Sequence, residues 1–228
     1  MNAAPRITRL GEDALLCFFT APDDTVVPMP VQQRLWQLCR LLEAERESLR
    51  LCEIVPGMGN LLLRWNRPAG SPCPFDVLLE RLPPLWHEGA AAVPTARVVT
   101  IPVRYGGTAG PDLEDVAREC GLSPTEVIAL HSQTHYAVYC LGFQPGFAYL
   151  GGLDSRLHTP RRATPRLAIP AGSVAIGGSQ TGIYPLSTPG GWHVIGHTPL
   201  RLFDPSSAPG VLLQPGDTVR FVPMPEGS

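Results

Sequence analysis

The chain has 228 residues, of which 44% are hydrophobic and 17% charged, a composition typical of a globular protein with a buried core. Its formal net charge is −2 and it contains no basic block, which argues against binding to a nucleic-acid backbone. All 18 basic residues are arginine. The absence of lysine excludes a Schiff-base enzyme, a Walker A phosphate loop, a kinase with a catalytic lysine and a biotin carrier. Any bound anion must therefore be held by arginine, histidine or backbone N–H groups.

Cysteine usage and hydropathy predict a cytoplasmic protein with reduced thiols and no membrane span. The six cysteines are at least 13 positions apart, so no CxxC redox or zinc motif is present, and each lies in an apolar segment suited to packing. The first residues lack the apolar stretch of a signal peptide, and no window approaches the ~18 consecutive apolar residues of a membrane helix.

The first 90 residues predict a small α+β domain. Short alternating runs indicate four strands, and apolar residues three or four positions apart indicate two helices. The expected strands are Ile7–Leu10, Ala14–Thr20, Leu51–Val55 and Asn60–Trp65; the expected buried helix faces are Val31, Leu35, Leu38 and Leu42, and, within Pro74–Trp86, Phe75, Leu78, Leu79 and Leu82. Pro83 and Pro84 should disturb the end of the second helix. A Gly/Ala-rich stretch near residue 90 predicts a hinge, with domains at 1–90 and 95–228.

The second domain is expected to be rich in strands, with two helices near its start. Pro111–Cys120 predicts one helix, and Ser123–Ser132 predicts another with a capping box between Ser123 and Glu126. After Gly142, short apolar runs separated by Gly/Pro turns argue for an antiparallel barrel or sandwich. The expected strands are Arg97–Val103, Tyr136–Leu141, Leu167–Ile169, Val174–Ile176, Val194–Ile195, Leu200–Phe203, Val211–Leu213 and Val219–Val222.

A glycine-rich loop at Gly142–Leu153 is the densest candidate site. It presents Phe143, Gln144 and Phe147 among four glycines, where backbone N–H groups can approach a ligand closely. The alternative is a tight barrel corner whose two phenylalanines fill the core. The spacing does not separate these two interpretations.

Four arginines, Arg156, Arg161, Arg162 and Arg166, lie within 11 residues together with His158. No acidic residue lies within this stretch, so it forms a local positive patch in a slightly acidic chain. Guanidinium groups match carboxylate and phosphate oxygens, which favours anion recognition here. The alternatives are arginines that bind backbone carbonyls in an irregular loop or neutralise acids on a partner.

The segment from Gly172 to Thr198 suits a small-molecule pocket, because it combines hydroxyls, Gln180 and many glycines with Trp192 as a wall. His193 and His197 are four positions apart, but the glycines around them argue against a helical metal pair.

Other polar clusters have simpler explanations. His131 and His135 straddle a helix end, which we expect to be capped with one solvated histidine. Asp112 and Asp115 could bind magnesium, but their place at a helix start is explained by the helix dipole. The chain contains neither a GxSxG elbow nor an HExxH motif.

Six closely spaced motifs carry a family resemblance. They are YCLGFQPGFAYLGG at Tyr139–Gly152, TPRRATPR at Thr159–Arg166, PAGSV at Pro170–Val174, QTGIYP at Gln180–Pro185, PGGW at Pro189–Trp192 and GHTP at Gly196–Pro199. Segments at Val55–Met58, Pro102–Gly107, Gly110–Leu113 and Gly216–Val222 fit as well. This series resembles the family of 5-oxoprolinase B subunits and KipI proteins (PxpB/KipI), also described as allophanate hydrolase subunit 1 or a carboxyltransferase C/D domain.

The resemblance implies a small α+β N-terminal domain followed by a cyclophilin-like antiparallel β-barrel. It also implies two partners, a KipA-type C subunit and an A subunit, which together with this chain convert 5-oxoproline, ATP and water to glutamate, ADP and phosphate. Mg²⁺ is expected with the ATP, and its ligands are not visible in this chain. Two alternatives remain open, a KipI-type inhibitor of a sensor histidine kinase and a carboxyltransferase component acting on a urea-like amide.

The site residues are predicted from motif density and residue chemistry. Arg162, His158 and Gln144 are expected to be catalytic, and no metal ligand is expected. The residues expected to bind substrate or phosphate are Arg161, Arg166, Tyr149, Gln180, Tyr184, Gly190, Gly191, Trp192 and His197.

Overall fold

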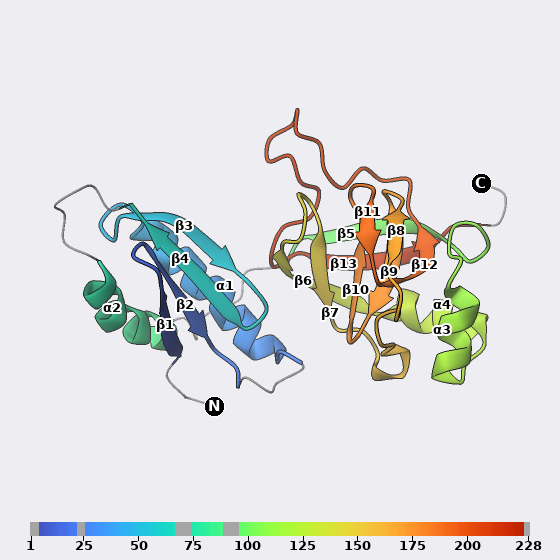
Figure 1. Ribbon diagram of the computed structural model, residues 1–228, viewed down its shortest axis with the longest axis horizontal. Coiled ribbons are helices and arrows are strands. Elements are labelled where there is room, and N and C mark those ends of the chain that lie inside the picture. Colours follow the sequence, from blue (N-terminus) through green and yellow to red (C-terminus); the bar gives the residue numbers. More distant parts are fainter. Residues whose placement is uncertain (1–4, 22–25, 67–73, 89–95, 226–228) are drawn as a thin grey trace. The chain divides into compact units, whose positions relative to one another are not determined.

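A computed structural model describes residues 5–21, 26–66, 74–88 and 96–225. The chain divides into two compact units, Met1–Thr95 and Ala96–Ser228, which are coloured blue to green and green to red in Figure 1. The expected hinge near residue 90, and Cys73, lie outside the described residues. No helix in the described ranges is long and apolar enough to cross a membrane.

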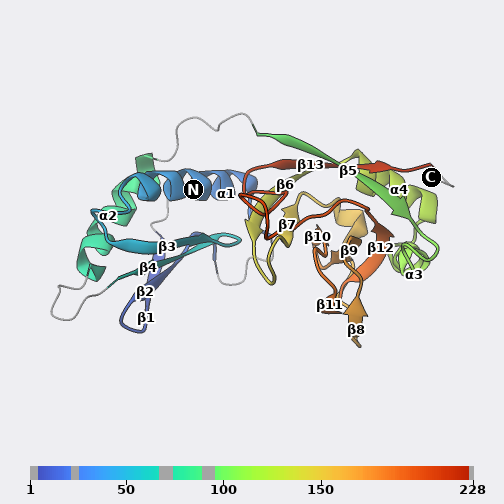
Figure 2. The ribbon, with the colours of Figure 1, turned by 90° about the horizontal axis from the view of Figure 1, so that it is seen from above.

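The first unit is a four-stranded antiparallel sheet covered by two helices. The strands are β1 (Arg6–Leu10), β2 (Ala14–Phe18), β3 (Leu51–Pro56) and β4 (Asn60–Trp65), and the helices are α1 (Met29–Ala44) and α2 (Phe75–Glu88). The strand order is β1-β2-β4-β3, and both helices lie on the same face of the sheet (Figure 2). Leucines of both helices and of the central strands form the core between them, as the helical and alternating periodicities predict.

The predicted buried face of α2 is wrong at one position. Leu79 is exposed, and α2 buries Leu78, Leu82, Leu85 and Trp86 instead; these four positions share one face at 3.6 residues per turn. The helix also continues through Pro83 and Pro84 as far as Glu88. In α1, Val31 packs partly buried against the core, as predicted, and its neighbour Gln32 is fully buried. Its side chain donates to the Gly57 carbonyl and accepts from the Gly59 N–H, each at 3.0 Å, so the β3–β4 turn is tied to the helix.

The second unit is built around a closed seven-stranded barrel. Its strands are β5 (Val98–Tyr105), β6 (His135–Leu141), β7 (Ala148–Gly151), β9 (Ser173–Gly177), β10 (Gln180–Ile183), β12 (His193–His197) and β13 (Thr218–Pro223). The order around the barrel is β10-β7-β6-β13-β5-β12-β9. Neighbouring strands are antiparallel except for β13 and β5, which are parallel. The predicted barrel is therefore confirmed, with one parallel pair that the expectation of an antiparallel barrel does not include.

Two helices and a small hairpin complete this unit. Helix α3 (Leu113–Cys120) ends at Gly121, whose φ of 67° is left-handed, and α4 (Pro124–Gln133) begins with the predicted capping box. Strands β8 (Arg166–Ile169) and β11 (Thr188–Gly190) pair outside the barrel, away from the two helices in Figure 2. A short 3-10 helix, η1 (Ser155–Leu157), precedes them.

The strand predictions fail where strands are very short. The sequence does not predict β7, β10 and β11, because their three or four residues are too few to show alternation. The runs Leu200–Phe203 and Val211–Leu213 contain only an isolated bridge between Phe203 and Val211.

His131 is buried beside the barrel core and His135 is exposed, in agreement with the expectation of one solvated histidine at this helix end. The Thr181 hydroxyl donates to the Ala175 carbonyl and therefore accepts from His131 Nε2 at 2.9 Å. The Tyr105 hydroxyl then donates to Nδ1 at 2.7 Å. Burial lowers the pKa of His131 to about 3, so the neutral imidazole is held with both nitrogens paired.

We predict that His131 makes stability depend on pH. Below its ordinary pKa of about 6.5 the unfolded chain protonates His131, whereas the folded chain does not until about pH 3. Protons therefore favour the unfolded state between these two pKa values. The contribution of His131 to the unfolding free energy should fall by about 1.4 kcal/mol per pH unit as pH decreases. Urea unfolding, followed by ¹⁹F NMR of fluorotryptophan at Trp192, measures this. The difference in unfolding free energy between wild type and His131→Gln should shrink as pH is lowered from about 7 to about 5. A difference that stays constant would contradict the prediction.

Candidate functional site

The glycine-rich loop after β6 combines the two expected interpretations. Phe147 is buried, whereas Phe143 is 60% exposed and has a φ of 64°, a left-handed conformation that is unfavourable for a bulky residue. A tight turn around Phe143 accounts for this, because the Gln144 N–H donates to the Gly142 carbonyl at 2.7 Å, the bond pattern of a γ-turn with Phe143 at its centre. The Gln144 side chain donates to the Leu186 carbonyl at 3.3 Å. One phenylalanine thus closes the barrel corner and the other faces solvent.

An aromatic cluster lies beneath this loop. Phe147 packs edge-on against Tyr149, Tyr184 and Trp192, with ring centroids 5.1, 5.4 and 5.6 Å apart. Glycine permits two of these contacts. A Cβ on Gly177 would lie 2.5 Å from the Trp192 ring, and one on Gly190 would lie 2.6 Å from the Tyr184 hydroxyl. Gly177 and the PGGW motif therefore supply the space that the rings occupy.

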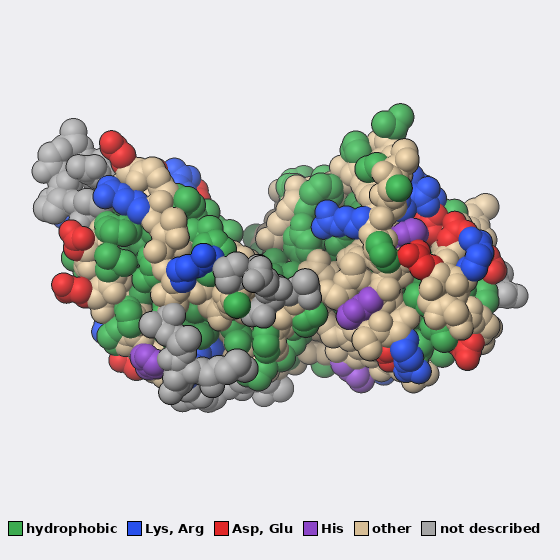
Figure 3. Space-filling model, turned by 60° about the horizontal axis from the view of Figure 1, so that its bottom comes forward, with side chains coloured by type: hydrophobic (Ala, Val, Ile, Leu, Met, Phe, Trp, Pro, Cys, Tyr) green, Lys and Arg blue, Asp and Glu red, His purple; other side chains and the backbone are tan. Residues whose placement is uncertain are grey.

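Arg161 is the charged group of this surface. Its guanidinium has no hydrogen-bond or ion-pair partner within the described ranges, and its side chain is exposed. Burial raises the pKa of both Tyr149 and Tyr184, and the positive charge of Arg161 opposes that rise at each. The two hydroxyls therefore remain protonated donors at neutral pH, close enough to Arg161 to respond to its charge. Hydrophobic side chains adjoin arginine side chains on the face of this unit shown in Figure 3.

The other arginines of the patch are already paired. Arg156 is exposed and forms an ion pair with Asp154 at 2.7 Å. Arg162 and Arg166 both bind Asp112, at 2.9 and 2.6 Å. The sequence pattern suggests four free guanidinium groups, and the described part of the chain leaves one.

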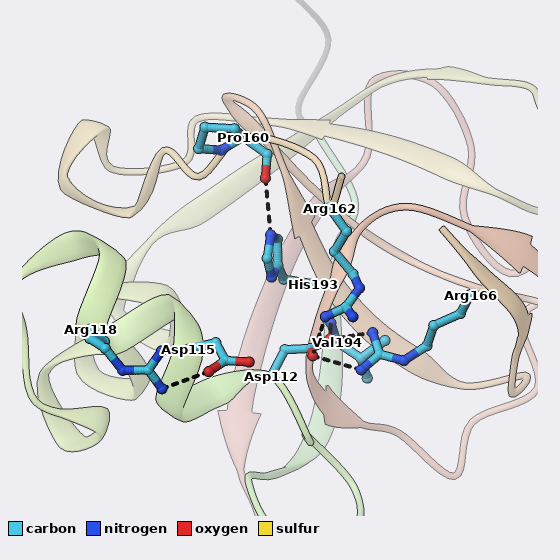
Figure 4. A network of polar contacts seen from close by, with 8 residues as sticks. All are labelled: Asp112, Asp115, Arg118, Pro160, Arg162, Arg166, His193 and Val194. Carbon is cyan, nitrogen blue, oxygen red and sulfur yellow. Dashed lines mark hydrogen bonds and ion pairs between the residues drawn. The ribbon is translucent and has the colours of Figure 1, made fainter. Parts of the chain in front are cut away.

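Asp112 has a role that the sequence analysis, which explains it by the helix dipole, does not predict. Its side chain is 2% exposed, and its carboxylate accepts three bonds from the two guanidinium groups and a fourth from the Val194 N–H at 2.7 Å. Figure 4 shows the side chains of both arginines converging on it. Burial alone would raise the pKa of Asp112, but the hydrogen bonds from Arg166 and Val194 and the two positive charges lower it below its ordinary value. It therefore remains ionised and cannot serve as a free metal ligand.

The remaining predicted residues fall into two groups. Gly191 and Gln180 lie next to the aromatic cluster. The Gly191 carbonyl accepts from the Arg162 N–H at 2.8 Å. Gln180 pairs with Gly177, the glycine that lies against the Trp192 ring. His158 and His197 each contact a backbone carbonyl instead, those of Leu153 at 3.2 Å and Ala171 at 3.0 Å. No group of three or more His, Cys, Asp or Glu side chains among the described residues could hold a metal ion.

We predict that Asp112 is worth much more to stability than its neighbour Asp115. Asp112→Ala leaves two half-buried guanidinium groups and a buried N–H unpaired, and should reduce the unfolding free energy by about 3–5 kcal/mol. Asp115→Ala is the matched control, because Asp115 and its partner Arg118 are 48% and 74% exposed, and should change it by less than about 0.5 kcal/mol. Urea unfolding measures both. Equal losses would show that the buried network does not stabilise this unit.

The same carboxylate should make this unit sensitive to acid. Because the folded-state pKa of Asp112 is lowered, its stabilising contribution is present above the unfolded-state pKa of about 3.9 and is lost as pH falls through the lower folded-state value. In urea unfolding below about pH 4, the difference between wild type and Asp112→Asn should diminish. A difference that is unchanged by acid would contradict this assignment.

Comparison with known proteins identifies the family. Residues 5–213 match the carboxyltransferase domain, subdomain C and D. The 5-oxoprolinase B subunit of Escherichia coli O157:H7 is 50% identical over 218 residues, which cover 96% of this chain and 95% of that protein. The 5-oxoprolinase B subunit of Haemophilus influenzae is 45% identical over 222 residues, 97% of each chain.

A solved structure agrees. The crystal structure of TTHA0988 superposes with a TM-score of 0.76 at 36% identity, covering 93% of this chain but only 40% of that longer one. The family resemblance carried by the six motifs is confirmed over nearly the whole sequence. The chain belongs to the carboxyltransferase C and D subdomain family, together with the bacterial 5-oxoprolinase B subunits.

Proposed function

We propose that this chain is the B subunit of an ATP-dependent 5-oxoprolinase, which acts with an A and a C subunit to convert 5-oxoproline, ATP and water to glutamate, ADP and phosphate. The observation that carries the proposal is its 50% identity, over 96% of the chain, to a protein named as the B subunit of 5-oxoprolinase. The aromatic and arginine surface of the barrel unit adds a chemical reason.

The reaction defines what an active site must provide. A lactam is stabilised by resonance, so its opening needs coupling to ATP. Phosphorylation of the lactam oxygen releases ADP and leaves an imidate-like phosphate, to which water adds at the ring carbon. Cleavage of the C–N bond then gives an acyl phosphate, and a second water releases phosphate. The site must therefore bind a carboxylate, donate hydrogen bonds to an amide oxygen and stabilise phosphoryl charge.

Arg161 and Tyr149 suit the first two of these tasks. A free guanidinium can bind the carboxylate of 5-oxoproline through paired N–H donors. The hydroxyl of Tyr149, which is partly exposed and whose pKa is raised by burial, can donate to the lactam oxygen. Phe143, which is 60% exposed and packs edge-on against the buried Phe147 ring, supplies an apolar wall for the ring methylenes. This assignment favours Arg161 over the predicted catalytic Arg162, which is bound to Asp112.

ATP and its Mg²⁺ are assigned to another chain of the complex in this proposal. The described residues contain no cluster of metal-binding side chains, and Asp112 is occupied by two guanidinium groups and a backbone N–H. The described residues of this chain therefore do not fit a magnesium site. An active site completed by the C subunit would combine an anion-binding surface from this chain with nucleotide-binding groups from its partner.

The proposal predicts turnover only from the complete complex. Co-expression with the C subunit and addition of the A subunit should give stoichiometric ADP and glutamate that depend on 5-oxoproline. Full 5-oxoproline-dependent turnover by this chain alone would contradict a shared site. A stable complex that hydrolyses ATP with urea-like amides instead would favour the carboxyltransferase alternative. Failure to bind the A and C subunits would favour a kinase inhibitor.

The proposal also predicts which arginine the substrate needs. In the active complex, Arg161→Ala should raise KM for 5-oxoproline by about 10- to 100-fold, because a charged hydrogen bond contributes roughly 1.5–3 kcal/mol. Arg156→Ala is the matched control, since Arg156 belongs to the same patch but is exposed and paired with Asp154, and it should leave KM unchanged. Equal effects of the two substitutions would remove Arg161 from the site.

A further inference from the structure

We infer that His193 is a positioning residue that holds the backbone on the N-terminal side of Arg161. It thereby fixes the place of the Arg161 guanidinium, which is unpaired among the described residues. This inference rests on the proposed function for its kinetic consequence. Its structural content, a tether from β12 to the loop 159–166, stands on the contacts themselves.

The loop that carries Arg161 is fixed on both sides of that residue. Before it, His193 Nε2 donates to the Pro160 carbonyl at 3.0 Å, and Thr159 exchanges two backbone hydrogen bonds with Gly178, at 3.2 and 2.7 Å. After it, the Arg162 N–H donates to the Gly191 carbonyl at 2.8 Å, and its guanidinium binds Asp112 at 2.9 Å. Arg161 is thus an exposed side chain on a constrained backbone.

Two consecutive residues of β12, His193 and Val194, make the contacts to Pro160 and to Asp112. In Figure 4, His193 lies between Pro160 on one side and the Asp112 ion pairs on the other. The next residue, Val194, donates its N–H to the Asp112 carboxylate at 2.7 Å and accepts the Asp112 N–H at 2.9 Å. The tether through His193 and the ion pairs of Asp112 therefore share one rigid strand.

The environment of His193 suits a single task. The side chain is 8% exposed, and its Nδ1 is buried without a hydrogen-bond partner in the described part of the chain. The Pro160 carbonyl is a pure acceptor, so Nε2 carries the proton. An imidazole that gives up hydration at one nitrogen to make one bond through the other contributes little net stability. It does fix the position of the carbonyl directly before Arg161.

Hydrogen exchange of the full chain tests the tether without any activity. His193→Phe keeps a buried ring and removes the donor, and should speed exchange of the Arg162 amide about tenfold, equivalent to losing one hydrogen bond. His193→Gln restores an N–H donor and should return exchange toward wild type. His135→Ala, which changes an exposed histidine of the same unit, is the control. Unchanged exchange in His193→Phe would overturn the inference.

Kinetics of the complete complex test whether the tether acts through Arg161. His193→Phe should raise KM for 5-oxoproline with kcat nearly unchanged, as Arg161→Ala does. The double variant should have the KM of Arg161→Ala alone, because a misplaced guanidinium cannot matter once it is absent. Additive effects would show an independent structural role and overturn the inference. Absence of turnover in the wild-type complex would refute the proposed function instead, and the exchange result would still decide the tether.

Discussion

A buried carboxylate has to be paired, and in this protein the pairing of Asp112 organises the barrel unit. Its partners come from the start of β8, the preceding loop and β12, while its own backbone begins α3. Loss of its charge would leave guanidinium groups without compensation in a half-buried setting. The loop that presents Arg161 and the strand that carries His193 are both held by this one side chain. The candidate site therefore depends on an ion pair that itself contacts no substrate in the proposed reaction.

Much of the fold follows from local sequence signals. The capping box at Ser123 and Glu126 and the left-handed Gly121 act within a few residues, so they are readable without tertiary information. The four strands of the first unit are long enough to alternate. Leu79 shows the limit of such reasoning, since a leucine next to a buried face satisfies the same periodicity and only packing decides which one is covered.

The candidate site was predictable in its parts but not in its connections. The glycine and aromatic motifs indicate the cluster of Tyr149, Tyr184 and Trp192, because glycines close to aromatic residues in the sequence leave room for the rings to pack. The ion pairs of Asp112 are not predictable in this way, because its arginine partners are 50 and 54 positions away. The charge of Asp112 also has a local explanation at the start of a helix. A run of four arginines without a nearby acid was the available signal that a distant carboxylate must neutralise some of them.

The position of β13 between β5 and β6 has a consequence for biosynthesis. β13 lies between β5 and β6, and the Arg97–Asp217 ion pair beside it joins residues 120 positions apart. The barrel cannot close on the ribosome until its last strand has emerged from the exit tunnel. Until then β5 and β6 expose unpaired backbone edges, which are templates for association with other chains. Nascent chains stalled before residue 218 should therefore be the form of this protein that most needs chaperones.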